Sequence, residues 1–318
     1  MKTNRILITG GFGAIGINLI NKLMENNLNE IHVIDNLSAG TANFSSKVQF
    51  SHLDISNSEK VNSFFNKYKP NFIFHLAAHF ANQNSVDHPI SDVETNVIGV
   101  INILESQKTN EFLKKFVYAS SSCVYGNCSE MSETTEISPY DTPYAINKYV
   151  GELYGKYYAE IHKIPLICAR IFNSFGPGEM PGQYRNVIPN FINKALLNED
   201  IIITGSGNET RDFTFVNDTV DLLIKLSESS FNKAEIFNAG TGTKTSINYL
   251  ANKIVELTNS KSQIIYKEAR GWDHVKNRCS DISKSSQYLN YNPNSDFESS
   301  LFDTINWIRE KLILNNKI

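Results

Sequence analysis

The sequence predicts an α/β protein in which a doubly wound parallel sheet carries a smaller, mixed α/β C-terminal lobe. Three observations predict this fold class. Short β-rich segments alternate with helical periodicity through the first half of the 318 residues, and several of these segments are apolar on both faces. Strands that are apolar on both faces are typical of parallel sheets covered by helices on each side. After about Asn173 the alternation gives way to shorter, mixed segments.

The first helix illustrates the alternation. Residues 14–27 place Ile15, Leu19, Leu23 and Met24 on one helix face, which can pack against a sheet. Strand–helix alternation of this kind indicates parallel strands joined by right-handed crossovers. The strands are expected over residues 5–9, 31–35, 48–53, 72–76, 116–120 and 165–171.

The second half begins where Gly176, Pro177 and Gly178 break the periodicity. We expect a first domain over residues 1–173 and a substrate lobe over 174–318, with some of the later chain returning to the first domain. A ligand site would lie between the two. One continuous domain with insertions is the alternative. Helices are expected over 187–197, 246–257 and 297–312, and short strands near Ile201, Phe213 and Ile236.

The composition excludes several classes of protein. The formal net charge is −3 and basic residues are scattered, whereas nucleic acids and anionic membranes require a concentrated basic face. No apolar run approaches the ~18 residues of a membrane span, and the N-terminus enters the first strand without a signal-peptide pattern. Because the cysteines lack metal-ligand spacing, we expect no metal and a reducing, cytoplasmic location. They are Cys123, Cys128, Cys168 and Cys279.

A glycine-rich turn follows the first predicted strand. Gly10, Gly13 and Gly16 lie between that strand and the first helix. Glycines let the backbone turn tightly and approach a pyrophosphate, and the helix N-terminus offers free N–H groups. Asp35 ends the second predicted strand about 20 residues further on, where a ribose diol is bound in such sites. The pattern predicts a Rossmann-type dinucleotide site in the first domain.

Asp35 also predicts which dinucleotide is bound. Its carboxylate can accept hydrogen bonds from both ribose hydroxyls but would repel a 2′-phosphate. The residues that follow, among them Asn36 and Ser38, include no Arg or Lys to hold such a phosphate. NAD is therefore favoured over NADP. Asp54 and Ile55, after the third strand, are candidates for the edge of the adenine, with a turn as the alternative interpretation of Asp54.

Tyr144 and Lys148 are four residues apart, so on a helix they share one face, about 6 Å apart along the axis. Thr142 as a cap and Pro143 in the first turn predict that a helix begins just before them. A free tyrosine has a pKa of about 10, but a nearby ammonium and a positive nicotinamide ring favour its phenolate. The serine run around Ser121 ends the fifth strand. A serine there can hydrogen-bond the substrate hydroxyl from which the tyrosine removes a proton.

With these residues assembled, the sequence resembles the extended short-chain dehydrogenase/reductase family. Within that family it is similar to NAD-dependent nucleotide-sugar epimerases and dehydratases of the UDP-glucose 4-epimerase type. The resemblance covers essentially the whole chain, and its motifs occur in the family's order. They are the Gly10, Gly13 and Gly16 turn, residues 35–38, 75–78, 96–99 and 120–126, Tyr144 with Lys148, and residues 170–177 and 210–213.

The resemblance implies roles for individual residues. Tyr144 would be the base, Lys148 its activator and a ribose ligand, and Ser121 the serine that binds the reacting hydroxyl. Asn96 would be the helix asparagine near the cofactor, and a homodimer or higher homo-oligomer is implied. Further cofactor contacts are implied for Ile15, Leu76, Ala77 and Ala78, and contacts to the sugar or its diphosphate for Asn173, Arg211, Arg270 and Arg278.

Two departures from the family pattern narrow the expected reaction. The 4,6-dehydratases carry Asp and Glu directly after the catalytic Ser or Thr, whereas this chain has Ser122 and Cys123, which cannot act as that acid–base pair. Galactose epimerases commonly have a lysine soon after the turn at 75–78, whereas this chain has the polar stretch Asn82–Asn84. That stretch is either an ordinary loop or a wall of the cofactor site.

We therefore expect NAD-dependent oxidation at C4 of a nucleotide-diphosphate sugar, and specifically a 4-epimerase. The alternative is a net C4 dehydrogenase that releases a 4-keto sugar nucleotide, for example a GDP-heptose, for capsule or lipopolysaccharide synthesis. A catalytically silent NAD-sensing or RNA-binding protein is a third class, against which the intact Ser121, Tyr144 and Lys148 argue.

Overall fold

The computed structural model describes residues 3–40, 47–128, 130–271 and 275–316. Within these residues seven strands form one sheet in the order β11-β6-β5-β4-β1-β2-β3. Every neighbouring pair in this sheet is parallel. The strands are β1 Asn4–Thr9, β2 Asn29–Asp35, β3 Gln49–His52, β4 Phe72–His75, β5 Lys115–Ser121, β6 Leu166–Ile171 and β11 Glu235–Ala239.

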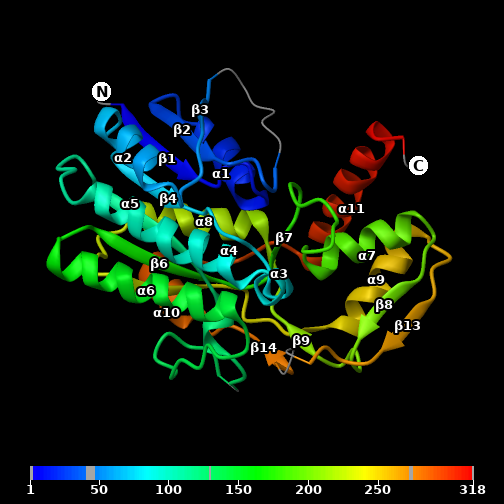
Figure 1. Cartoon of the computed structure of the whole chain (residues 1–318). Coiled ribbons are helices and arrows are strands. Elements are labelled where there is room, and N and C mark those ends of the chain that lie inside the picture. Colours follow the sequence, from blue (N-terminus) through cyan, green and yellow to red (C-terminus); the bar gives the residue numbers. More distant parts are fainter. Residues whose placement is uncertain (1–2, 41–46, 129, 272–274, 317–318) are drawn as a thin grey trace.

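Helices cover both faces of the sheet, as Figure 1 shows. On one face Leu19 and Leu223 belong to a buried cluster with the inward side chains of β1 and β2. On the other face Phe65 and Leu104 pack with the opposite side chains of the same sheet. The fold class predicted from the sequence, a doubly wound parallel sheet, is confirmed. The helices that cover the two faces of the sheet are α1 Ala14–Met24, α2 Ser58–Lys67, α5 Val100–Gln107, α6 Pro143–Ile161, α8 Val216–Glu228 and α10 Ser283–Leu289.

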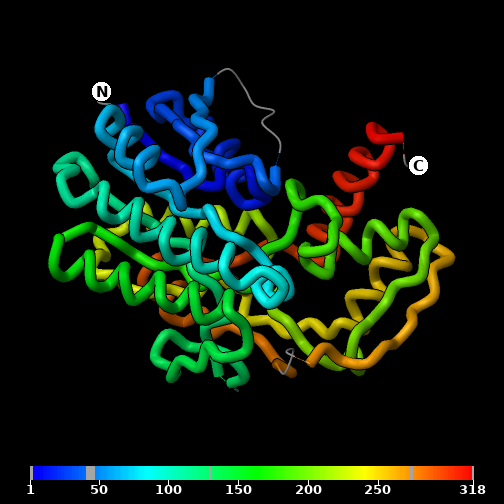
Figure 2. Tube along the Cα trace, in the orientation of Figure 1, coloured from blue at the N-terminus to red at the C-terminus, as the bar shows by residue number. Residues whose placement is uncertain are grey.

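The chain crosses between the two lobes more than once. The short strand expected near Ile236 is β11, which pairs with β6 along the outer edge of the main sheet, for example Ile236 beside Cys168. Figure 2 shows the later part of the chain, α8 and then α10, lying against the sheet before the final helix leaves for the other lobe. Residues after 173 therefore contribute one strand, β11, and two helices, α8 and α10, to the lobe built around the seven-stranded sheet.

The second lobe has its own apolar core, to which Ile188, Leu250 and Ile305 contribute from three helices. These helices are close to the expected ranges: α7 Val187–Leu196, α9 Ile247–Thr258 and α11 Phe297–Leu314. Short strand pairs complete the lobe. They are β8 Ile201–Thr204 with β13 Ile264–Lys267, β9 Thr210–Arg211 with β12 Thr245–Ser246 and β14 Asn277–Arg278, and β7 Ser174–Phe175 with β10 Thr214–Phe215.

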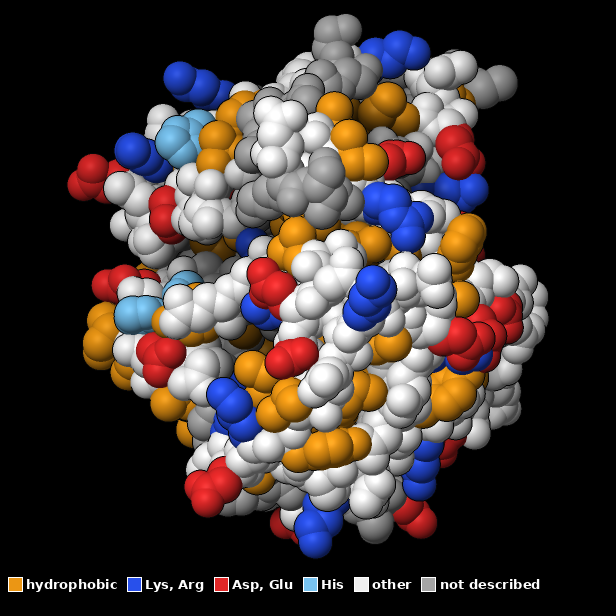
Figure 3. All heavy atoms as spheres, turned by 90° about the vertical axis from the view of Figure 1, so that its right-hand side faces the viewer, with side chains coloured by type: hydrophobic (Ala, Val, Ile, Leu, Met, Phe, Trp, Pro, Cys, Tyr) orange, Lys and Arg blue, Asp and Glu red, His pale blue; other side chains and the backbone are white. Residues whose placement is uncertain are grey.

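The surface agrees with the scattered charge of the sequence. On the face shown in Figure 3, Lys and Arg side chains are interspersed with Asp and Glu. Among the described helices none has the length and apolar character needed to cross a membrane.

Candidate active site

The glycine turn lies at the carboxyl end of β1 and is closely packed. Gly10 has φ +67, and a Cβ there would lie 2.6 Å from the backbone of Ala77. A Cβ on Gly16 would lie 2.5 Å from the carbonyl oxygen of Gly11. Gly13 is the N-cap of α1 and supplies no side-chain cap, so the first N–H groups of the helix are left for another acceptor. This cradle fits the pyrophosphate of a dinucleotide.

Asp35 connects this turn to the end of β2. Its carboxylate accepts hydrogen bonds from the backbone N–H groups of Phe12 (2.9 Å) and Leu37 (2.8 Å). Asn36 donates to Asp54 at 2.9 Å, which ties the ends of β2 and β3 together. Carboxylate oxygens accept more than one hydrogen bond each, so Asp35 can still bind ribose hydroxyls.

Two other predicted cofactor residues, Ile55 and Asn96, are buried behind the carboxyl ends of the strands. Ile55 is buried, and its Cδ1 would be 2.6 Å from a Cβ at Gly99, so its side chain packs in the core. Asn96 is fully buried and holds the backbone of His79, accepting from its N–H (3.1 Å) and donating to its carbonyl oxygen (3.0 Å). It therefore fixes the chain that leaves β4. Of the remaining predicted contacts, Leu76, Ala77 and Ala78 directly follow β4, Ser38 lies three residues after the end of β2, and Ile15 is in the first turn of α1.

The predicted proton-transfer residues come together from two elements. Ser121 ends β5, and α6 begins with Thr142, whose hydroxyl oxygen caps the helix by accepting from the N–H of Ala145. The Ser121 hydroxyl lies near enough to the phenol of Tyr144 to lower the pKa of that phenol. The Nζ of Lys148 lies 5.8 Å from the centre of the Tyr144 ring and donates to a backbone carbonyl at 2.9 Å. The expected helix start and the shared face of this pair are confirmed.

Burial opposes charge on both groups. It raises the pKa of Tyr144, an effect that the neighbouring Cys123 and Asp92 reinforce and that Ser121 and the Arg278 guanidinium counter. Burial also lowers the pKa of Lys148 to about 8, although Asp92 raises it. The protein alone therefore keeps the phenol protonated at neutral pH, and the phenolate needs further positive charge beside it.

We expect the buried Lys148 to make stability depend on pH. Its pKa is about 8 in the fold and 10.5 in the reference state, so the unfolded chain binds more protons between these values. The penalty for burying the ammonium is present below pH 8 and is lost as pH rises, which adds up to about 3 kcal/mol to the free energy of unfolding. Urea denaturation measures the free energy of unfolding of the wild type and of Lys148→Met. The wild-type value minus the variant value should rise from pH 7 to pH 10, and a difference that does not change with pH would contradict this.

A buried carboxylate that the sequence did not single out lies beside the pair. Asp92 is fully buried and accepts from Asn96 (2.9 Å) and from Asn147 (2.7 Å). Asn147 lies one residue before Lys148, so Asp92 fixes the first turns of α6 against the helices α4 Pro89–Val93 and the π-helix Glu94–Gly99. Irregular helical turns of this kind are frequent at functional sites.

The stretch Asn82–Asn84 is helical, not a loop as one interpretation had it. It forms the first turn of α3 Asn82–Asp87. Asn82 accepts from the Thr142 hydroxyl at 2.9 Å, so this helix is tied to the cap of α6. Asn84 donates to the backbone carbonyl of Phe80, just before the helix, and Gln83 donates to the exposed Asp87.

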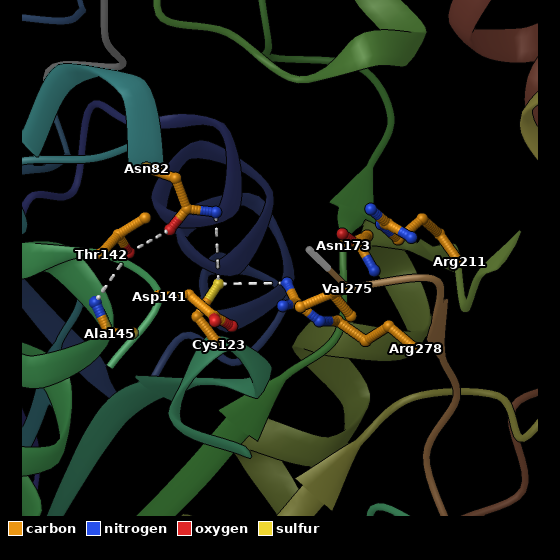
Figure 4. Close-up of a pocket in the computed structure, with 9 residues that line it drawn as sticks. All are labelled: Asn82, Cys123, Asp141, Thr142, Ala145, Asn173, Arg211, Val275 and Arg278. Carbon is orange, nitrogen blue, oxygen red and sulfur yellow. Dashed lines mark hydrogen bonds between the residues drawn. The ribbon is translucent and has the colours of Figure 1, made fainter. Parts of the chain in front are cut away.

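A pocket opens beside Cys123, between the two lobes (Figure 4). Three of the predicted substrate residues line it, namely Asn173, Arg211 and Arg278. Arg270 is exposed on the surface and is not part of this lining. Sequence reasoning assigned none of the other lining side chains to the substrate, although it considered Asn82 as part of a wall of the cofactor site. The other lining residues are Asn82, Cys123, Asp141, Thr142, Ala145 and Val275.

A buried ion pair supports the site from below. Arg170 on β6 donates twice to Glu152 on α6, at 2.9 and 2.7 Å, and both side chains are almost fully buried. Ser120 donates to the same carboxylate at 2.5 Å. Glu152 lies one helical turn after Lys148, and Ser120 directly precedes Ser121. The pair therefore joins β5, which carries Ser121, to α6, which carries Tyr144 and Lys148.

A doubly wound sheet, a glycine cradle with an acidic strand end, and a Ser–Tyr–Lys set at the carboxyl edge define an NAD-dependent enzyme of the short-chain dehydrogenase/reductase type. The family comparison agrees with this class. The chain belongs to the NAD dependent epimerase/dehydratase family, whose model matches residues 6–240.

Individual relatives cover nearly the whole chain. A solved epimerase of Methanothermobacter thermautotrophicus is 37% identical with a TM-score of 0.92, covering 99% of this chain and 95% of its own. A UDP-glucose 4-epimerase of Thermotoga maritima, solved with UDP-glucose, is 32% identical with a TM-score of 0.92, covering 97% and 99%. A UDP-N-acetyl-α-D-glucosaminuronate decarboxylase of Bacillus cytotoxicus is 31% identical, covering 96% and 98%. Relatives of this chain therefore include 4-epimerases and decarboxylases, and its cofactor is NAD.

Proposed function

We propose that this enzyme is a nucleotide-sugar 4-epimerase. The observation that carries the proposal is the Ser121, Tyr144 and Lys148 set beside a pocket lined by Asn173 and Arg211. This arrangement offers a base and a hydroxyl-binding group near one end of a polar pocket, and a guanidinium for a diphosphate at the other. Ser122 and Cys123 occupy the positions where dehydration would need an acid–base pair.

Each residue then has a defined task. Ser121 binds the sugar 4-hydroxyl, and Tyr144 removes its proton. The positive charge of Lys148 favours the tyrosine anion and binds ribose hydroxyls of the cofactor. NAD, when bound, accepts the C4 hydride and returns it. Arg211 and Asn173 hold the diphosphate while the 4-keto sugar turns to present its other face.

The decisive experiment follows the label at C4. Purified protein is incubated with UDP-, GDP- and dTDP-sugars, and the products are identified by NMR. With substrate deuterated at C4, an epimerase keeps the label through turnover and needs no external oxidant. Stoichiometric NADH in solution with a released 4-keto product would instead identify a C4 dehydrogenase.

The choice of NAD over NADP is expected to depend on the charge of Asp35. Asp35→Asn keeps an oxygen that can accept from Phe12 but removes the charge that repels a 2′-phosphate. We expect the wild type to bind NAD at least ~10-fold more tightly than NADP and the variant to narrow this ratio. Isothermal titration of both cofactors measures it. Equal binding of the two by the wild type would contradict the assignment.

We also propose a homodimer formed through α4, the π-helix and α6. Exposed apolar side chains lie along these neighbouring elements, which is unusual for a face that meets only water. Leu153→Glu should shift the molar mass measured by light scattering to that of a monomer, whereas Tyr266→Glu on β13 should not. A monomeric wild type would refute the proposal. The exposed residues are Ile90, Val93, Ile98, Ile146, Leu153, Tyr154, Tyr157 and Ile161.

A further inference from the structure

Arg278 is a buried cation that forms no ion pair with an acidic residue in the part of the chain that the structure describes. Its side chain is 7% exposed, and its guanidinium donates to the Sγ of Cys123 at 3.2 Å. A thiol is a weak acceptor, and the Nε of the same guanidinium has no hydrogen-bond partner among the described residues. No carboxylate in the described part of the chain forms an ion pair with it. Because a buried charge is unfavourable unless it is paired, this burial indicates that an anion completes the site.

The position of Arg278 separates it from the other arginine of the pocket. Arg278 on β14 and Arg211 on β9 are register neighbours in parallel strands, so both reach the same cavity. In Figure 4 the Arg278 side chain extends to Cys123, whereas Arg211 lies beside Asn173. Cys123 belongs to a buried cluster with Tyr144. Arg278 therefore faces the reaction end of the pocket, and Arg211 the far end.

We propose that Arg278 binds a carboxylate on the sugar ring, so that the substrate is a nucleotide-activated uronic acid. This inference rests on the proposed function, which places the sugar beside Tyr144 and the diphosphate beside Arg211. The group next to C4 is then the C5 substituent. A neutral hydroxymethyl group there would leave the guanidinium uncompensated, whereas a carboxylate matches its planar fork. Asp141 is the acidic residue among the described lining side chains, and the two arginines outnumber it.

The same ion pair bears on the fate of the oxidised sugar. A ketone at C4 is β to a carboxylate on C5, so breaking the C5–C6 bond would release CO₂ and leave its electron pair on the enolate. That step moves negative charge away from the carboxylate. Arg278 stabilises the charge where it is, which favours keeping the carboxylate until the hydride returns to C4.

Paired substrates test the subsite. UDP-glucuronic acid and UDP-glucose differ only in the C5 substituent, so their ratio of kcat/KM isolates that group. We expect the wild type to favour the uronate at least ~10-fold and Arg278→Gln to lower the ratio about 100-fold, as for loss of a buried charged hydrogen bond. Arg278→Lys should retain part of the preference. Arg211→Gln should lower kcat/KM by the same factor for both substrates and leave their ratio unchanged.

Other outcomes have defined meanings. If Arg278→Gln lowers kcat/KM by the same factor for both substrates, Arg278 acts on the diphosphate and the inference is wrong. Preference of the wild type for UDP-glucose would also overturn it. If neither substrate is converted, the proposed function fails, and titration calorimetry of the two nucleotides then decides the subsite. An Arg278-dependent advantage for UDP-glucuronic acid would uphold it, and its absence would refute it. Pentose and CO₂ as products would keep the carboxylate subsite but replace the epimerase by a decarboxylase.

Discussion

Replacing Tyr144 by phenylalanine is expected to lower turnover at least ~100-fold, the lower end of what a general acid–base group contributes. The phenol is buried and lies near the Ser121 hydroxyl, so its removal takes away the group that we expect to accept the substrate proton. NAD affinity should change little, because the ring and its packing remain. Turnover is measured by NMR of the sugar product, and cofactor affinity by titration.

A matched control makes the same chemical change at an exposed position outside the proposed dimer face. Tyr266→Phe on β13 removes the hydroxyl of a tyrosine that is about half exposed, so activity should be retained. Lys148→Ala should reduce both turnover and NAD affinity, because its ammonium is expected to serve tyrosine and ribose together. Near-normal turnover of Tyr144→Phe would mean that the proton takes another route.

Breaking the Glu152–Arg170 pair should destabilise the fold by about 3–5 kcal/mol, because either substitution leaves its partner charged and buried without compensation. Both side chains are almost fully excluded from water, and Arg170 also lies over the Tyr125 ring. Glu152→Gln and Arg170→Met are therefore each expected to lower the midpoint of urea denaturation substantially. A change below about 1 kcal/mol in either variant would contradict this.

The double variant separates pairing from packing. If the penalty comes from the orphaned charge, Glu152→Gln with Arg170→Met should cost less than the sum of the single changes. Additive effects would instead indicate that each side chain acts through its own packing. The surface pair Lys22–Glu25 is the matched control, since exposed pairs contribute about 1 kcal/mol or less.

Much of the fold follows from local patterns. The strand that ends at Asp35, the helix that starts at Ala14 and the turn at Gly10 between them are each specified by a few neighbouring residues. The start of α6 was predictable for the same reason, because Thr142 and Pro143 are local signals. These features give the cofactor site and the pairing of Tyr144 with Lys148 on one helix face.

The sequence by itself thus determined the main strands, the glycine turn before α1 and the pairing of Tyr144 with Lys148 on one helix face, since each depends on spacing along a few turns of chain. Tertiary structure alone decided which distant groups meet. It put β11 on the edge of the first sheet, buried Asp92 against Asn147, and brought Arg278 rather than Arg270 into the pocket. Cys123 and Arg278 are 155 residues apart. Such contacts depend on how the lobes and helices pack, and packing also decides which charged side chains are buried.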